Sequence, residues 1–120
     1  MNIYEEYKSK LRTPEEAVKV VKDGDWVDYS QTCSFPFLLD AALAARKEVR
    51  NAISMRPVQV VEQDPEQKAF TFNAWHCSGL DRKYCDKGLA YYSPMLFRDN
   101  GLYYSKGYAP VNVAMVTVTP

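Results

Sequence analysis

Apolar and polar residues follow two different periods along this chain, and the two periods predict strands and helices in turn. The run Trp26–Tyr29 is short and largely apolar, and residues 70–75 alternate between two faces, as strands do. After the first run and a polar loop at residues 30–34, apolar residues recur at the spacing of one helical face, at Phe35, Leu38, Leu39, Ala42 and Leu43. We therefore expect a helix that begins near Phe35 and Pro36, with Pro36 in its first turn.

The clearest helix start in the sequence lies at residues 13–16. Thr13 is a good N-cap, Pro14 suits the first helical position, and Glu16 completes a capping box. This helix is expected to bury Ala17, Val18, Val20 and Val21. Lys22 in its last turn and Gly24 just beyond it are expected to end it.

Three further helices are predicted. Residues 4–11 form a short amphipathic helix in this interpretation. Ser78, with Asp81 three residues later, indicates an N-cap for a helix that runs to about Lys87 and stops at Gly88. A third, short helix is expected over residues 95–104.

Two more strands complete the prediction. Residues 55–57 are expected to open a strand at residues 58–61. Residues 111–118 are almost continuously apolar and largely β-branched, which is typical of a strand covered on both faces. Strands that alternate with helices of about ten residues indicate an α/β fold with an open, largely parallel sheet and flanking helices.

The order of these elements also suggests where a ligand would bind. A strand that runs into a helix N-terminus, as residues 26–46 do, aims free N–H groups at the carboxyl edge of the sheet. The chain stops at Thr119 and Pro120, at the tip of the strand that we expect to be central. We therefore expect a fragment, in which further loops and sheet are missing.

Composition excludes several classes of partner. The chain has 120 residues, enough for one domain, and its 15 basic residues balance 15 acidic ones without a basic stripe, which argues against nucleic acid. Its apolar runs are too short to span a membrane, and its charged first twelve residues do not form a signal peptide. Three cysteines without a CxxC pair favour reduced thiols, so a cytoplasmic location is expected.

Cys33 is the strongest local candidate for chemistry. It lies with Ser34 just before a predicted helix N-terminus, which favours a thiolate, and His76 at the end of another strand has the chemistry of a base. The alternative is a small buried cysteine packed between strand and helix, and no third, orienting residue is evident. For His76, a hydrogen-bond donor in a pocket and a strand-end histidine bonded to backbone remain equally open.

The other candidates give weaker signals. A zinc site made from Cys33, His76, Cys77 and Cys85 matches no common ligand spacing, so no metal is expected. Arg82 and Lys83 either meet an anionic ligand or are exposed helix cations. The tyrosines are either a sugar-stacking face or a half-buried layer: Tyr91, Tyr92, Tyr103, Tyr104 and Tyr108. Residues alone thus predict a ligand-facing α/β half-site without a catalytic residue.

Motifs along nearly the whole chain have the order and spacing of a known family. They are YKSKL (7–11), TPEEAV (13–18), GDWVDY (24–29), FP (35–36), LDAALA (39–44), NAWHCSG (73–79), RK (82–83), GLAYYSP (88–94) and PVNVAMV (110–116). The sequence resembles the N-terminal part of the acetyl-CoA hydrolase/transferase family, the class I CoA-transferases that act on short-chain acyl-CoAs. The branch it most resembles contains the butyryl-CoA:acetate and 4-hydroxybutyrate CoA-transferases.

The resemblance implies an enzyme of butyrate metabolism that moves CoA between an acyl-CoA, such as butyryl-CoA, and acetate. The family fold has two similar α/β halves, and a glutamate of the second half forms an anhydride and then a glutamyl-CoA thioester. This chain would be the N-terminal portion of the first half and hold no catalytic residue. Its implied partners are acyl-CoA, a short-chain carboxylate and the rest of the enzyme's own chain. CoA is a substrate, no cofactor is implied, and homo-oligomer formation is left open.

By position, the resemblance implies that this half supplies one wall of the acyl pocket and backbone donors for developing oxyanions. The loop that would carry this role consists of Gln31, Thr32, Cys33, Ser34, Phe35 and Pro36. A neighbouring wall would consist of Trp75, His76, Cys77, Ser78 and Gly79. Many relatives carry glycine in the first loop, whereas residues 30–34 contain none, so side chains are expected to narrow the pocket here.

Two other hypotheses remain at this point. One is a thiol hydrolase that uses Cys33 and His76. The other is a non-catalytic α/β module that binds a ligand or another protein.

Overall fold

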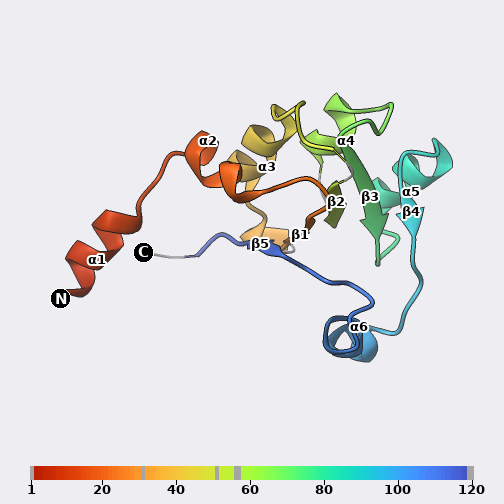
Figure 1. The fold of residues 1–120 in the computed structure, drawn as a ribbon. Helices are drawn as coiled ribbons and strands as arrows, with labels where there is room; N and C mark the ends of the chain where they lie inside the picture. The colour runs from red at the N-terminus through yellow and green to blue at the C-terminus, as the bar shows by residue number, and fades with distance from the viewer. Residues whose placement is uncertain (1, 31, 51, 56–57, 119–120) are drawn as a thin grey trace.

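The computed structural model describes residues 2–30, 32–50, 52–55 and 58–118, and only the backbone at residues 32 and 53–55. Within these residues one sheet of five strands runs in the order β4-β3-β2-β1-β5, and every pairing is parallel (Figure 1). The strands are β1 (Trp26–Tyr29), β2 (Ala52–Met55), β3 (Phe70–Ala74), β4 (Tyr91–Tyr92) and β5 (Val113–Met115). The predicted α/β class with an open, parallel sheet is confirmed.

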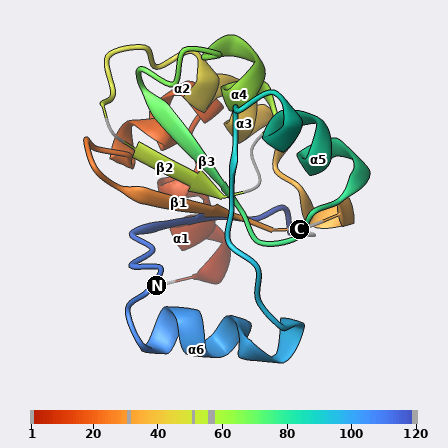
Figure 2. The same cartoon turned by 90° about the vertical axis from the view of Figure 1, so that its right-hand side faces the viewer.

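The helices cover the two faces of the sheet unequally. They are α1 (Ile3–Lys10), α2 (Pro14–Ala17), α3 (Phe37–Ala44), α4 (Gln59–Gln63), α5 (Gly79–Asp86) and α6 (Asn100–Ser105), with 3-10 turns η1 (Val18–Val20), η2 (Thr32–Ser34) and η3 (Phe97–Asp99). In Figures 1 and 2, α2, α3 and α4 lie on one face of the sheet and α6 lies on the opposite side.

The strand order changes direction at β1. The chain steps from β1 through β2 and β3 to β4, and then returns to the other side of β1 to form β5. The loop that leaves the carboxyl end of β1 leads towards β2, whereas β5 enters the sheet on the opposite side of β1. In open α/β sheets this topological switch point is where ligands bind.

The helix start at Thr13 is confirmed in detail. The Thr13 hydroxyl accepts a hydrogen bond from the Glu16 N–H at 3.2 Å, and the Glu16 carboxylate accepts one from the Thr13 N–H at 3.1 Å. The α-helix itself is short, because the chain tightens into η1 after Ala17. As a result Val18 and Val21 are buried in the core, whereas Val20, predicted to be buried, is exposed.

The predicted strand at residues 58–61 is wrong, because this run belongs to helix α4 and the strand is Ala52–Met55. A short apolar run has no clear period, so strand and buried helix are hard to distinguish from sequence. Helix α4 is stabilised from a distant part of the chain. The Asp40 carboxylate, on α3, accepts hydrogen bonds from Val58 N–H at 3.3 Å and Gln59 N–H at 2.8 Å, and so caps the start of α4.

Two other predictions need correction. The strand expected over residues 111–118 forms only at Val113–Met115, and in the described sheet it is an edge strand, not a central one. Helix α3 begins one residue later than expected, with Pro36 as its N-cap. This shift turns Leu38 outward, where it is 74% exposed, while Asp40, Leu43 and Ala44 are buried.

The remaining helices lie close to their predicted positions. Ser78 and Asp81 form a second capping box at the start of α5, and Gly88, at φ +71°, follows its end. The helix predicted over residues 95–104 forms as η3 followed by α6. The first predicted helix forms as α1, but it buries none of its residues.

A buried carboxylate, Asp64, fixes the entry into β3. It accepts hydrogen bonds from the backbone N–H groups of Lys68 at 3.2 Å, Ala69 at 2.8 Å and Phe70 at 2.9 Å. Burial raises the pKa of Asp64, but these three donors outweigh burial and leave the pKa below its usual value of 3.8. The charged form of Asp64 is therefore favoured by folding.

We expect Asp64→Ala to lower the free energy of unfolding by about 1–3 kcal/mol at neutral pH, because three buried N–H groups lose their acceptor. The stabilisation is present above pH 3.8 and is lost as the pH falls through the lower, folded-state pKa. Urea unfolding at a series of pH values measures both effects. The control is Glu66→Ala in the same turn, where the side chain is exposed. Equal losses in the two variants would contradict the role of Asp64.

Candidate functional site

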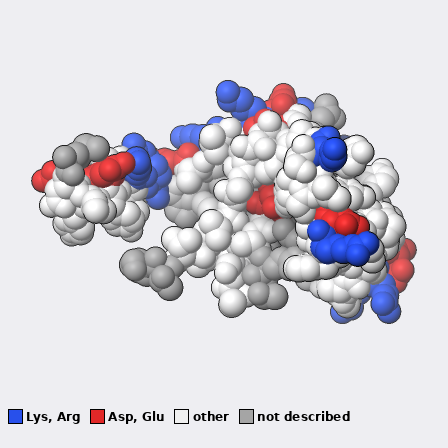
Figure 3. All heavy atoms as spheres, turned by 90° about the horizontal axis from the view of Figure 1, so that it is seen from below, with Lys and Arg blue, Asp and Glu red and all other residues white. Residues whose placement is uncertain are grey.

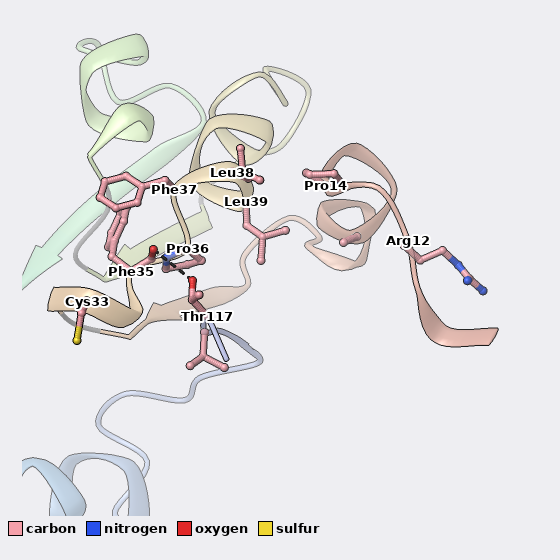
Figure 4. A pocket seen from close by; sticks show the side chains of 11 residues that line it. Arg12, Pro14, Cys33, Phe35, Pro36, Phe37, Leu38, Leu39 and Thr117 are labelled. Atoms are coloured by element: carbon pink, nitrogen blue, oxygen red, sulfur yellow. Dashed lines mark hydrogen bonds between the residues drawn. The ribbon is translucent and has the colours of Figure 1, made fainter. Parts of the chain in front are cut away.

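A groove of about 480 Å³ lies at the switch point between β1 and β5 (Figure 4). Three segments line it. Residues 35–39 and Cys33 come from the connection between β1 and α3, Val116 and Thr117 follow β5, and Arg12, Pro14 and Ala17 come from the start of α2. The lining is mostly apolar, as is usual for small-molecule sites.

Hydrogen bonds fasten the two loops at the carboxyl edge to each other. Ser30 N–H donates to the Met115 carbonyl at 3.0 Å, and Thr117 N–H donates to the Ser34 carbonyl at 3.0 Å. The Thr117 hydroxyl donates to the Phe35 carbonyl at 3.3 Å, which Figure 4 marks. The loop after β1 is thus held in place by the segment after β5, and the floor of the groove is preorganised.

Aromatic rings support one wall of the groove. The buried ring of Tyr29 stacks on Phe35 with centroids 5.6 Å apart, and Phe35 meets Phe37 edge-on at 4.7 Å. Both arrangements are among those that aromatic pairs prefer. The core of the sheet therefore extends directly into the lining of the groove.

Helix α3 begins at this groove without a side-chain cap, because its N-cap residue is Pro36. In the described part of the chain, Phe37 N–H donates to the Phe35 carbonyl and Asp40 N–H to the Pro36 carbonyl, but the N–H groups of Leu38 and Leu39 find no acceptor. A helix start with free N–H groups carries partial positive charge. The groove therefore combines apolar walls with backbone donors at one end.

Arg12 lines the groove only through the base of its side chain. In Figure 4 its guanidinium points away from the other lining residues. It donates instead to the carbonyls of Ser9 at 2.8 Å and Leu11 at 2.7 Å. The guanidinium thus caps the end of α1 rather than facing the groove.

The first predicted wall lines this groove in part. Cys33 is exposed, Phe35 is half-buried and Pro36 is buried, and all three contribute to the lining. Ser34 acts through its carbonyl, which accepts from Thr117 N–H and from the Ser30 hydroxyl. Gln31 lies outside the described residues, and of Thr32 only the backbone is described.

The second predicted wall, residues 75–79, does not line the groove. Trp75 is buried against α6, with its ring 5.4 Å from Tyr103 and 5.2 Å from Tyr104. Ser78 caps α5 and Gly79 is the first residue of that helix. The side chain of Cys77 neighbours Cys85, whose pKa is raised by burial and further by Cys77, Asp81 and Asp86.

His76 packs against η3 rather than against Cys33. Its ring lies 5.8 Å from that of Phe97, and its Nε2 is buried without a hydrogen-bond partner among the described residues. Strand β2 separates β1 from β3, so the loops that carry Cys33 and His76 start about 10 Å apart. The structure therefore does not assemble a cysteine–histidine pair from these two residues.

The other candidates show no ligand site. Arg82 and Lys83 are exposed on α5. Tyr103 is the only half-buried member of the tyrosine set, whose other members are exposed. Among the residues that the structure describes, no group of three or more histidine, cysteine or acidic side chains is placed to hold a metal ion. None of the helices described is long and apolar enough to cross a membrane.

The groove residues that lie outside both predicted walls include Leu38, Leu39, Val116 and Thr117. The two leucines were identified only as part of a helical stripe. The other two residues reach the site because β5 lies beside β1, and that adjacency is a property of the topology. A local sequence pattern carries no signal for it.

Asp40 lies on α3, whose first residues line the groove, and its carboxylate accepts hydrogen bonds from the backbone at the start of α4. It is fully buried, and burial raises its pKa above the usual 3.8, although hydrogen bonds from Gln59, Val58 and Tyr29 partly oppose the rise. Because the folded-state pKa is the higher one, folding favours protonated Asp40. Its contribution is therefore largest below pH 3.8 and decreases as the pH rises through the folded-state pKa.

We expect Asp40→Asn to keep an acceptor for α4 and to remove the decrease in stability with rising pH. Asp40→Ala leaves the α4 N–H groups unsatisfied and should cost about 1–3 kcal/mol of unfolding free energy, with the larger loss at acid pH. Urea unfolding of both variants and the unchanged protein, from acid to neutral pH, measures this. Asp64 is present in both the Asn variant and the unchanged protein, so the difference between their unfolding free energies at each pH reports the titration of Asp40 alone. Parallel pH profiles for these two proteins would refute the assignment.

Three comparisons with known proteins bear on this geometry. The family model of the acetyl-CoA hydrolase/transferase N-terminal domain matches residues 1–120. The chain is 40% identical to the butyryl-CoA:acetate CoA-transferase of Anaerostipes caccae, over 100% of this chain and 28% of that protein. It therefore spans just over a quarter of that relative's length.

Solved structures show the same fold. RipA from Yersinia pestis superposes with a TM-score of 0.82 at 20% identity, over 100% of this chain and 31% of RipA. The 4-hydroxybutyrate CoA-transferase of Porphyromonas gingivalis superposes with a TM-score of 0.59 at 18% identity, over 96% of this chain and 26% of that one. Because the model of the family's N-terminal domain matches the entire chain, the chain belongs to the acetyl-CoA hydrolase/transferase family.

Proposed function

We propose that this chain acts as the N-terminal part of a short-chain acyl-CoA transferase. The full enzyme would move CoA between an acyl-CoA, such as butyryl-CoA, and acetate. The observation that supports this most strongly is the 40% identity, along the whole chain, to a butyryl-CoA:acetate CoA-transferase. The groove at the switch point of the sheet agrees with it, because ligands of open α/β folds bind at such a point.

The reacting carboxylate in this proposal is a glutamate outside this chain. It attacks the thioester carbonyl and expels CoA thiolate, and CoA then attacks the mixed anhydride to give glutamyl-CoA and the free carboxylic acid. Acetate attacks the glutamyl-CoA in turn, and the same steps in reverse pass CoA to acetate. None of the residues 1–120 is assigned a catalytic role.

The residues of this chain would hold and orient the acyl group. Phe35, Leu39 and Val116 supply an apolar lining for a short alkyl chain. The free N–H groups of Leu38 and Leu39 point to stabilisation of the negative charge that develops on the carbonyl oxygen. Preorganised backbone donors at a dry apolar site are effective because they need no rearrangement during the reaction.

The proposal extends to partners and location. Acyl-CoA and a short-chain carboxylate are the substrates, CoA is a substrate rather than a bound cofactor, and the rest of the enzyme completes the site. We also infer a cytoplasmic location, which three cysteines without a CxxC pair support.

The first test is activity of the purified 120-residue chain with butyryl-CoA and acetate. We expect none, because the nucleophile is absent. Formation of acetyl-CoA above a control without protein, measured by chromatography, would refute the assignment of chemistry to residues outside the chain.

The second test uses a full-length chimera, in which residues 1–120 replace the matching segment of the Anaerostipes caccae enzyme. Val116→Trp should lower kcat/KM for butyryl-CoA about tenfold or more, since a bulky side chain would occupy the part of the apolar groove that is proposed to hold the acyl group. Acetyl-CoA, with its shorter chain, should be affected less.

Val20→Trp is the matched control, because Val20 and Val116 are similarly exposed, at 57% and 53%, but only Val116 lines the groove. Steady-state kinetics with both acyl-CoAs measures the ratio. Equal effects of the two substitutions, or no preference between the acyl-CoAs, would place the acyl pocket elsewhere.

A further inference from the structure

Helix α1 stands apart from the rest of the molecule. Figure 1 shows it at the end of a linking segment, away from the sheet and from the other helices. None of its residues is buried, and Ile3 is 85% exposed. An isolated helix of eight residues is only marginally stable in water, so its formation normally depends on tertiary packing.

The surface of α1 is divided into an apolar and a charged side. The apolar side carries four exposed residues at helical spacing: Ile3, Tyr4, Tyr7 and Leu11. The first three of these, together with Asn2, surround a hollow on the helix surface. Glu5 lies on the opposite side, and the ion pair between Glu6 and Lys10, at 2.6 Å, flanks the apolar side next to Ile3. Figure 3 shows the protruding α1 with its charged atoms gathered along one side.

The local interactions of α1 define its ends but leave its apolar side uncovered. The Asn2 side chain accepts from Tyr4 N–H at 3.2 Å at the start of the helix, and Arg12 bonds carbonyls at its end. The ammonium of Lys8 lies 4.5 Å from the centre of the Tyr4 ring, at the edge of the apolar side. Four exposed apolar side chains on one helix are typical of a docking surface.

We propose that this apolar side of α1 is the docking surface for the part of the full-length transferase that follows residue 120, an inference that rests on the proposed function. The relatives have the chain to supply this occupant, because the match covers 28% of the Anaerostipes caccae enzyme and 31% of RipA. The docked surface should be mostly apolar, since the docking side of α1 consists of apolar side chains with the Lys8 ammonium at its edge.

The position of α1 next to the groove supports this occupant. Arg12 and Pro14, which directly follow α1 along the chain, line the groove. A domain that brings its glutamate to the groove therefore comes close to α1. In this arrangement α1 packs against the part of the enzyme that completes the site.

The test compares the 120-residue chain with the full-length chimera described above. In the chimera, the amides of α1 should exchange their hydrogens about tenfold or more slowly than in the 120-residue chain, because burial of aromatic side chains opposes opening of the helix. Hydrogen exchange followed by mass spectrometry measures this. Equal exchange in the two proteins would overturn the proposal.

Tyr4→Ala/Tyr7→Ala should abolish the protection of α1 and lower the midpoint of thermal unfolding of the chimera. The same double variant should leave the midpoint of the 120-residue chain unchanged, because neither tyrosine is buried there. Alanine is the better helix former, so lost helix propensity cannot explain a loss of stability. The control is Glu5→Ala on the charged side, which should change neither exchange nor midpoint.

Two outcomes separate this proposal from its alternatives. A dimer of the 120-residue chain in ultracentrifugation, broken by Tyr7→Asp, would show that a second copy covers α1 and would overturn the proposal. A chimera with protected α1 but no transferase activity would reject the proposed function and support the docking surface, since exchange and unfolding do not depend on catalysis.

Discussion

The pairing of β5 with β1 is the constraint on which the rest of this structure depends. Residues 27–29 align with residues 113–115, and the same ladder continues into the loops through Ser30 N–H to Met115 and Thr117 N–H to Ser34. If β5 did not pair with β1 on the side away from β2, successive strands would all be added in one direction and the carboxyl edge of the sheet would have no switch point. The groove, the placement of Phe35 and the start of α3 all follow from it.

Two buried carboxylates organise the face of the sheet opposite α6, and they do so with opposite electrostatic consequences. Asp40 joins α3 to α4, and Asp64 joins the turn to β3, in each case by accepting backbone N–H groups that would otherwise be unsatisfied. Asp64 receives three donors and its pKa is lowered, whereas burial dominates at Asp40 and raises its pKa. The balance between donors and desolvation thus decides which protonation state folding favours.

The parts of the fold that sequence could predict are those fixed by short-range chemistry. The capping boxes at Thr13 and Ser78 each involve residues three positions apart, and both form as expected. Helix α4 was mistaken for a strand because its cap comes from Asp40, eighteen residues earlier. For the groove, the predicted loop contributes Cys33 and Phe35 to the lining, whereas Val116 and Thr117 reach it only through the strand order.

The same distinction explains why residues 75–79 were placed at the site although they do not line the groove. Both this segment and the loop after β1 leave the carboxyl edge of the sheet, and the family resemblance implies that they form neighbouring walls of one pocket. The inserted β2 separates them, and the packing of Trp75 on α6 and of His76 on Phe97 turns this segment towards the helix on the other side. The carboxyl edge of the sheet therefore contains two different surfaces. The β1–β5 side carries the mostly apolar groove, and because Arg12 and Pro14 line it just after α1 ends, a protein surface that covers this groove also comes close to α1.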